Sequence, residues 1–137
     1  MKTLCLVSCV GQKLDHTARA EELYNSPWFK AATQFAKTNY ESWAVLSAEH
    51  GIVEPEEEVA PYETTLNSMS FKERKTWANS VIYQLYYGDW DNVVILAGEK
   101  YRQYLAAWLE DNGFSYEAPM AGLGIGQQLQ WLKANNI

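Results

Sequence analysis

The segment NVVILA, Asn92–Ala97, decides the fold, because it is an unbroken apolar run of strand length. A run without polar alternation is typical of a strand that is buried on both faces of a sheet. Gly98 follows directly, and a helical pattern then runs from Glu99 to about Asn112. A strand followed at once by a helix predicts one unit of a parallel α/β sheet.

Outward from this run, three further segments have the character of strands, namely 3–10, 43–47 and 114–117. Helical patterns lie between them, at residues 17–24, from Pro27, from Ser68 or Ser70 to Tyr87, and after Gly126. The alternation predicts a single three-layer α/β domain over residues 1–137, with a mostly parallel four-stranded sheet and helices on both faces. Residues 48–69 read as one long connection without regular structure, a kind of loop that is usually functional or mobile.

Several helix starts carry capping signals. Ser26 precedes Pro27, whose missing N–H costs nothing at the first helical position. Glu73 stands three residues after Ser70, which is the spacing of a capping box. Thr17 has the right side chain to cap the helix predicted for residues 17–24.

The composition indicates a globular chain and excludes several classes of function. With 137 residues, 47% of them hydrophobic and 20% charged, the chain can bury one core. The net charge of −6 argues against broad, non-specific nucleic-acid binding. It leaves open a local basic pocket or a free nucleotide as ligand, and it fits a protein that binds another protein. No apolar run approaches the roughly 20 residues of a membrane helix, and the N-terminal run is too short for a signal peptide. We therefore expect a cytoplasmic protein that does not enter membranes.

The two cysteines, Cys5 and Cys9, lie four residues apart on the first predicted strand. The strand rise separates them by about 13 Å, too far for a disulfide. Cys9 has two readings, a nucleophile near Lys13 or, as we favour, a buried core thiol. The sequence has no Cys/His cluster, so we expect no metal and no cofactor.

Polar and small residues collect where the predicted strands end. Because ligands of parallel sheets bind beyond the carboxyl ends of the strands, these residues are the candidates for one cavity. From the first strand to the last they are Ser8, Cys9, Lys13, Ser47, Glu49, His50, Gly51, Gly98, Tyr101, Gly122, Gly124 and Gly126.

Within this set, Glu49, His50 and Lys13 are the candidate catalytic residues. Glu49 is slightly preferred to His50, and an extended backbone would point these neighbours to opposite sides. Lys13 either contacts a phosphate or carboxylate or is simply a solvated lysine. The backbone amides of Gly122–Gly126 either bind an anion at a helix start or only permit the turn.

The loop segment APYETTL carries Tyr62 and Thr65, which either close over a ligand or anchor the loop. Together with SCVGQK, LYNSPWF, LSAEHGIV and GLGIGQQLQWL, in this order, it resembles a bacterial and phage domain family of unknown function, numbered 6884. The resemblance singles out the motif positions Ser8, Cys9, Lys13, Tyr24, Ser26, Phe29, Ser47, Gly51, Tyr62, Thr65 and Leu66.

More distantly, the predicted arrangement of strands and helices looks like the uracil-DNA glycosylase-like α/β fold and the C-terminal part of archaeal tRNA deazaguanine-modifying enzymes. Both of these classes handle nucleobases. The chain departs from the glycosylases, because it has neither their water-activating aspartate in a proline-tyrosine loop nor their His-Pro-Ser loop. The resemblance therefore does not extend to classical uracil excision.

We expect a protein that handles a nucleobase or nucleoside, as an enzyme of the N-glycosidic bond that acts on a modified base or nucleotide by hydrolysis or base exchange. Glu49 would stabilise positive charge on the sugar. Two alternatives remain: a non-catalytic module that binds or sequesters a nucleotide, and a phage-type inhibitor whose acidic surface binds a protein partner.

Overall fold

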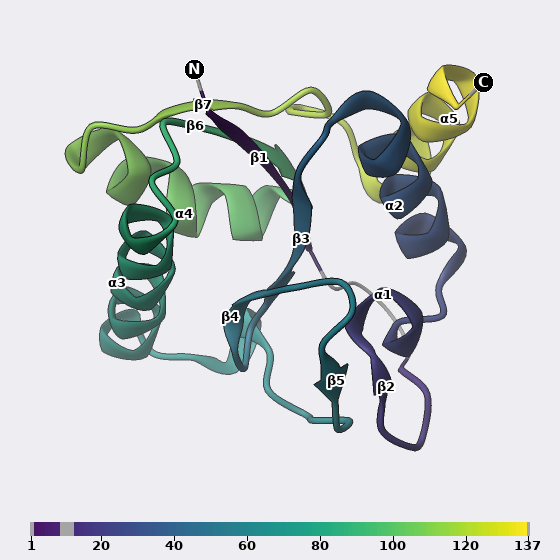
Figure 1. The fold of residues 1–137 in the computed structure, drawn as a ribbon, viewed down its shortest axis with the longest axis horizontal. Helices are drawn as coiled ribbons and strands as arrows, with labels where there is room; N and C mark the ends of the chain where they lie inside the picture. The colour runs from purple at the N-terminus through teal and green to yellow at the C-terminus, as the bar shows by residue number, and fades with distance from the viewer. Residues whose placement is uncertain (1, 9–12, 137) are drawn as a thin grey trace.

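The computed structural model describes residues 2–8 and 13–136, and its main sheet has the strand order β4-β3-β1-β6-β7 (Figure 1). Strands β1, β3, β6 and β7 are parallel, whereas β4 pairs antiparallel with β3 at one edge. The predicted three-layer α/β class is confirmed, but the sheet has five strands rather than four. The strands are β1 (Thr3–Ser8), β3 (Trp43–Ser47), β4 (Gly51–Val53), β6 (Asn92–Leu96) and β7 (Ser115–Glu117).

Helices cover both faces of this sheet (Figure 1). Helices α3 (Phe71–Tyr87) and α4 (Glu99–Asp111) pack on one face. Helices α1 (Ala20–Leu23), α2 (Pro27–Asn39) and α5 (Ile125–Asn135) pack on the other face. A separate two-stranded ribbon is formed by β2 (Ala18–Arg19) and β5 (Glu58–Val59). A short 3₁₀ helix, η1 (Leu66–Ser68), precedes α3.

The central strand β1 divides its side chains between two cores. Leu4 and Leu6 pack towards α3 and α4, and Cys5 and Val7 pack towards α2 and α5. This alternation follows from the period of two in a strand, and each large apolar side chain that is buried contributes about 1.5–3 kcal/mol. Burial also raises the pKa of the Cys5 thiol from 9.0 to about 12. Cys5 is therefore a core residue.

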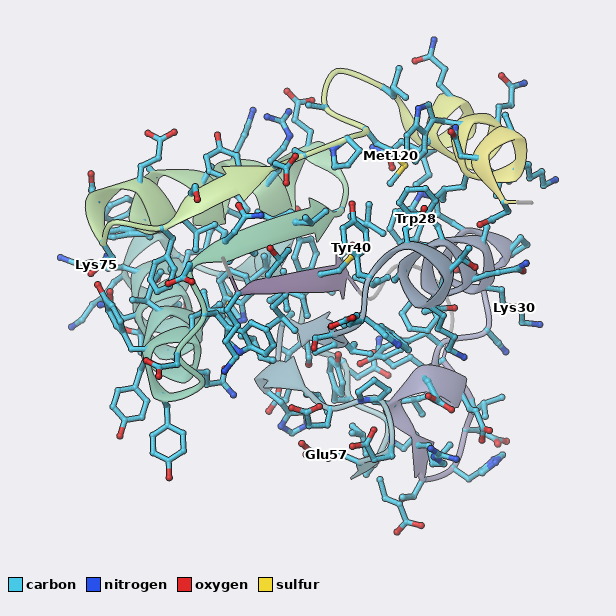
Figure 2. The ribbon with its side chains drawn as sticks, turned by 45° about the horizontal axis from the view of Figure 1, so that its top comes forward. Trp28, Lys30, Tyr40, Glu57, Lys75 and Met120 are labelled. Carbon is cyan, nitrogen blue, oxygen red and sulfur yellow. The ribbon has the colours of Figure 1, made fainter. Side chains whose placement is uncertain are left out.

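The loop that precedes α5 contributes Met120 to the core on the α2 and α5 side of the sheet. Figure 2 shows Met120 near Trp28 of α2, and both side chains belong to the same buried cluster. The indole nitrogen of Trp28 donates to Gln128 Oε1 of α5 at 3.0 Å. The contact ties α2 to α5 across the end of the sheet.

Two of the predicted caps are confirmed. Ser26 Oγ accepts a hydrogen bond from Phe29 N at 3.1 Å, and Ser70 forms the reciprocal capping box with Glu73. The prediction for Thr17 is wrong, because α1 begins only at Ala20 and has no side-chain cap. Residues 18–19 instead pair with residues 58–59, and this long-range pairing replaces the first helical turn.

The prediction that residues 48–69 lack regular structure is also wrong, since they contain β4, β5 and η1. A side chain on α3 secures β4 at the sheet edge. Gln84 Oε1 accepts from Ile52 N at 2.8 Å, and Gln84 Nε2 donates to Ile52 O at 2.9 Å. The amide thereby satisfies the outward-facing backbone groups of an edge strand, which would otherwise be open to pairing.

The strand order places a topological switch between β1 and β6. The chain leaves β1 through α2 on one face and reaches β6 through α3 on the opposite face. In open α/β sheets such a switch is where ligands bind, beyond the carboxyl ends of the strands. Among the described residues, no helix combines the length and the hydropathy needed to cross a membrane.

Candidate functional site

Ser47 organises the turn that follows β3. Its hydroxyl accepts hydrogen bonds from the backbone amides of Glu49 and His50, both at 3.1 Å, and donates to Tyr62 Oη at 2.8 Å. Its carbonyl accepts from Trp77 Nε1 of α3 at 2.9 Å. Residues 48–50 form a turn rather than the extended backbone that we expected. The turn is therefore held from both faces of the sheet.

Tyr62 connects this turn to Lys13. Its hydroxyl lies 2.5 Å from the hydroxyl of Tyr24, which extends the chain of hydrogen bonds from Ser47. The Lys13 ammonium sits 4.7 Å from the centroid of the Tyr62 ring. The His50 ring meets the same ring edge-on, with centroids 5.5 Å apart and planes at 85°. Lys13 and the Ser47–His50 turn, which lie far apart in sequence, thus converge on Tyr62.

Glu49 is oriented by the loop that follows β5. Its Oε2 atom accepts a hydrogen bond from Thr64 Oγ1, a contact that the sequence did not signal. Beside Glu49 lies a depression of about 460 Å³ between the turn and the first half of α3. Its lining includes His50, Met69 and Trp77. The depression is mainly apolar and has a carboxylate and an imidazole at its rim.

Ser8 ends β1 at the topological switch. It is fully buried, and its hydroxyl has no hydrogen-bond partner among the described residues. A buried polar group without a partner is costly and therefore marks a site that needs an explanation. Gly98, the N-cap of α4, follows the neighbouring strand and has open space where a Cβ would stand. Cys9, the next predicted residue, lies outside the described residues.

Three other predicted residues have structural contacts. Ser26 caps α2. The hydroxyl of Thr65 lies 3.1 Å from that of Ser68, across the 3₁₀ turn η1. The Tyr101 ring meets the Trp77 ring edge-on, with centroids 6.0 Å apart. Tyr101 is thus linked through Trp77 to the carbonyl of Ser47, whereas these contacts give Ser26 and Thr65 local roles.

The predicted glycines divide between two places. Gly51 closes the Ser47 turn with a φ of +72°, a conformation that favours glycine. Gly122, with a φ of +85°, and Gly124, the N-cap of α5, instead line a separate cavity of about 100 Å³ with Arg102. Gly126 lies within α5.

Gln128 organises this second cavity, and sequence reasoning did not identify it. Its side chain is 2% exposed, accepts from Trp28 Nε1 and donates to Leu123 O at 3.1 Å. The available signal is its position four residues before the buried Leu132, which places a glutamine on the apolar face of α5. The hydrogen bonds of Gln128 to described residues join this loop to α2 and to the residue after β6, and none of them reaches Ser47.

Among residues 2–8 and 13–136, no group of three or more His, Cys, Asp or Glu side chains is placed so that it could hold a metal ion. The chemistry at the Ser47 turn is that of one carboxylate, one imidazole, one ammonium and a chain of hydroxyls. Such groups can bind a polar ligand by hydrogen bonds and can stabilise charge that develops on it.

Comparison with known sequences assigns the chain to a protein family. The model of the "Family of unknown function (DUF6884)" matches residues 4–134, nearly the whole chain. The chain belongs to this family. It is also 32% identical over 142 residues to the "Uncharacterized protein YfjM" of Bacillus subtilis (strain 168), over 96% of this chain and 93% of that protein.

No solved structure matches this DUF6884 chain. The family resemblance is confirmed, and the more distant likeness to the uracil-DNA glycosylase fold stays a prediction. The motif positions Lys13, Tyr24, Ser47 and Tyr62, which lie far apart in sequence, form one connected cluster. The geometry therefore gives a physical reason for motifs that the sequence shows only as separate segments.

Proposed function

We propose that this DUF6884 domain binds a nucleobase or nucleoside at the Ser47 turn and acts on its N-glycosidic bond. The single observation that carries the proposal is the position of Glu49 and His50 at the rim of the apolar depression. Its volume of about 460 Å³ is in the ordinary range for small-molecule pockets. Hydrogen bonds from Thr64 to Glu49, and to Ser47 from the backbone, hold the rim in place.

The lining of the depression suits a base. Trp77 and Met69 offer apolar surface against which an aromatic ring can pack. The hydroxyl of Thr76 and the imidazole of His50 can hydrogen-bond the polar edge of the base. Such a combination of apolar floor and few polar groups is typical of pockets that bind small heterocycles.

The reaction fits the groups at the rim. Cleavage of an N-glycosidic bond leaves positive charge on the sugar and negative charge on the departing base. The Glu49 carboxylate would stabilise the sugar cation and orient the water that adds to it, while the proton released from the water passes to the base nitrogen. Thr64 holds the carboxylate in advance, so less reorganisation is needed in the transition state.

Lys13 and His50 both contact the ring of Tyr62, and Lys13 carries the charge that a phosphate or carboxylate of the substrate would meet. Ser8 adds a buried hydroxyl at the adjacent switch. Because Lys13 shares the Tyr62 ring with His50, which lines the depression, its ammonium would offer an anion site beside the base. This arrangement favours a nucleotide or a base within a nucleic acid over a free base.

The test combines binding and turnover. Thermal stabilisation by a panel of bases, nucleosides, nucleotides and short oligonucleotides identifies ligands, since a ligand bound only by the folded state raises the midpoint. Chromatography of the same mixtures then detects the released base. We expect Glu49→Gln to lower the rate of release by about 10²-fold or more, and Lys13→Ala to weaken phosphorylated ligands selectively.

The matched controls are Glu63→Gln, in the same loop as Thr64, and Lys30→Ala, on the outer side of α2 (Figure 2). Both should act like the parent chain. Saturable binding without base release would support the proposed binding site and refute the proposed cleavage of the N-glycosidic bond. If no member of the panel binds, or if Glu49→Gln and Lys13→Ala match the parent with a confirmed substrate, the proposal is wrong.

A further inference from the structure

A second, larger groove of about 660 Å³ lies at the opposite end of the sheet, near the start of β3 and the end of α3. It lies between the β4–β5 connection, where Figure 2 shows Glu57, and the C-terminal half of α3. None of its described lining residues belongs to the Ser47 turn. We call it the acidic groove, after a lining that includes Trp43, Glu54, Glu56, Tyr83, Tyr87 and Trp90.

The α3 wall of the groove is aromatic and exposed. Tyr83 and Tyr87 stand one turn apart, their side chains are 69% and 85% exposed, and their rings stack with centroids 6.5 Å apart. Large exposed aromatic side chains that gather beside a groove mark a binding surface. Tyrosine and tryptophan are also the residues that contribute most to protein interfaces.

The facing wall is negatively charged. Glu54, Glu56 and Glu57 lie within four residues of each other, and Glu41 adds a fourth carboxylate from the start of β3. Partial burial, followed by the charges of Glu56 and Glu57, raises the pKa of Glu54. Among the described residues, none of the four forms an ion pair. A cation in the groove would relieve the repulsion among these carboxylates.

The two tryptophans at the groove already contact cations of the chain itself. Lys2 Nζ lies 4.6 Å from the Trp90 ring centroid, and Lys37 Nζ lies 5.6 Å from that of Trp43. These distances are within the range of cation–π attraction. The groove therefore combines carboxylates with aromatic rings, the two kinds of group that bind guanidinium and ammonium ions.

The edge of β4 next to the groove is closed to another strand. The side chain of Gln84 satisfies both backbone groups of Ile52, and Glu57 Oε1 accepts from Glu54 N at 3.2 Å. An occupant would therefore be recognised through its side chains and not by extending the sheet. A symmetric pair of chains would set two acidic grooves against each other, which disfavours a second copy as the occupant.

We propose that the acidic groove binds an arginine- or lysine-containing segment of a partner protein. Its carboxylates would pair with the cationic heads, and Tyr83 and Tyr87 would pack against the aliphatic stems. Several separate carboxylates along one groove suit a segment with more than one basic residue. The site is independent of the proposed nucleobase site, so that either proposal can fail alone.

The test uses the full chain and fluorescent peptides in anisotropy titrations. The probes are a short arginine–glycine peptide, its lysine counterpart and a neutral glutamine–glycine counterpart. We expect the cationic peptides to bind, more weakly as salt rises. The double variant Glu41→Gln/Glu56→Gln should weaken binding about tenfold and Tyr87→Ala about threefold, from the usual strengths of exposed ion pairs and cation–π contacts.

Matched controls separate the groove from net charge and general exposure. Glu22→Gln/Glu63→Gln removes the same charge elsewhere, and Phe71→Ala removes an aromatic ring, 72% exposed, from the other end of α3. Both should stay within about twofold of the parent, below the energy of one exposed ion pair. Equal weakening by control and groove variants, binding of the neutral peptide, or self-association that Tyr87→Ala abolishes would overturn the proposal.

Discussion

Replacing Gly51 with alanine tests whether the turn at the candidate site is held as the contacts indicate. Gly51 has a φ of +72°, and a Cβ at this position would stand 2.5 Å from Gln84 Oε1. The left-handed conformation costs an alanine about 1–2 kcal/mol. Moving the glutamine tip would also break its two hydrogen bonds to Ile52, each worth about 0.5–1.5 kcal/mol.

Because β4 lies at the sheet edge, water can replace part of the hydrogen bonding that Ile52 loses. The cost should therefore fall in the lower half of the range obtained by adding the conformational cost to that of the two hydrogen bonds. We expect Gly51→Ala to reduce the free energy of unfolding by about 2–3 kcal/mol. Urea denaturation followed by circular dichroism and tryptophan fluorescence measures this value, and an unchanged m-value would show that only stability has changed.

Gly126→Ala is the matched control, since Gly126 lies within α5 and has open space where a Cβ would stand. There the same substitution should not destabilise the chain. Because Gly126 is the second residue of α5, any gain should stay below the roughly 0.5–1 kcal/mol of a helix interior. In the double variant Gly51→Ala/Gln84→Ala, the loss of the Gln84 amide has already removed the hydrogen bonds to Ile52. Adding Gly51→Ala to Gln84→Ala should therefore lower the free energy of unfolding by less than Gly51→Ala does alone. A loss below about 0.5 kcal/mol for Gly51→Ala, or full additivity in the double variant, would refute the reasoning.

Four further predictions concern the hydroxyl chain, the core thiol (two of them) and the buried glutamine. Tyr62→Phe keeps the ring but removes the hydroxyl that Ser47 donates to, and it should cost about 1–2 kcal/mol in urea denaturation; no loss would mean that the hydrogen bond contributes nothing. Cys5, with its pKa raised by burial, should resist iodoacetamide at about pH 8 in the folded chain and react in urea, as peptide mass spectrometry can measure. Because its unfolded pKa of 9.0 lies below the folded value, stability should also decline as the pH rises from 9.0 towards 12. Gln128→Leu leaves the Trp28 indole N–H without its acceptor and should cost about 1–3 kcal/mol; a more stable variant would contradict this role of the glutamine.

The elements that the sequence predicts well are those with a local physical signal. The run at 92–97 is long, apolar and bounded by turn residues, and it forms β6. Ser26 and Ser70 act as caps because their hydroxyls reach backbone amides only three residues away. Gly88 ends α3 as its C-cap. In each of these cases the interaction that fixes the element lies within a few residues of it.

The elements that the sequence does not predict depend on distant partners. Strand β4 has three residues, and its outer edge is completed by Gln84, which lies 32 residues from Ile52. The β2–β5 ribbon joins residues 18–19 to residues 58–59 and thereby displaces the helix start expected at Thr17. No window of sequence around either segment contains these contacts, so periodicity alone reads residues 48–69 as irregular.

The candidate site shows the same division. The rule that polar residues at strand ends converge groups Lys13, Ser47 and His50, and these three residues do lie around Tyr62. It does not distinguish this cluster from the separate cavity at Gly122 and Gly124. That cavity is also lined by Gln128, whose hydrogen bonds run to Trp28 and to Ala97 O. The strand ends share an edge, but the side chains that complete each pocket come from loops and helices that the rule does not address.

Helix α3 is the element on which both proposals depend, and its contacts explain why they can be tested separately. Near its first turns, Trp77 donates a hydrogen bond to the Ser47 carbonyl and lines the depression beside Glu49. Near its end, Tyr83 and Tyr87 line the acidic groove. The segment between Trp77 and Tyr83 contributes Val81 and Ile82 to the core, so a buried stretch separates the two ends. Removing an exposed ring at Tyr87 should therefore leave the Ser47 turn intact, so any effect of that variant on nucleotide binding would indicate coupling through α3.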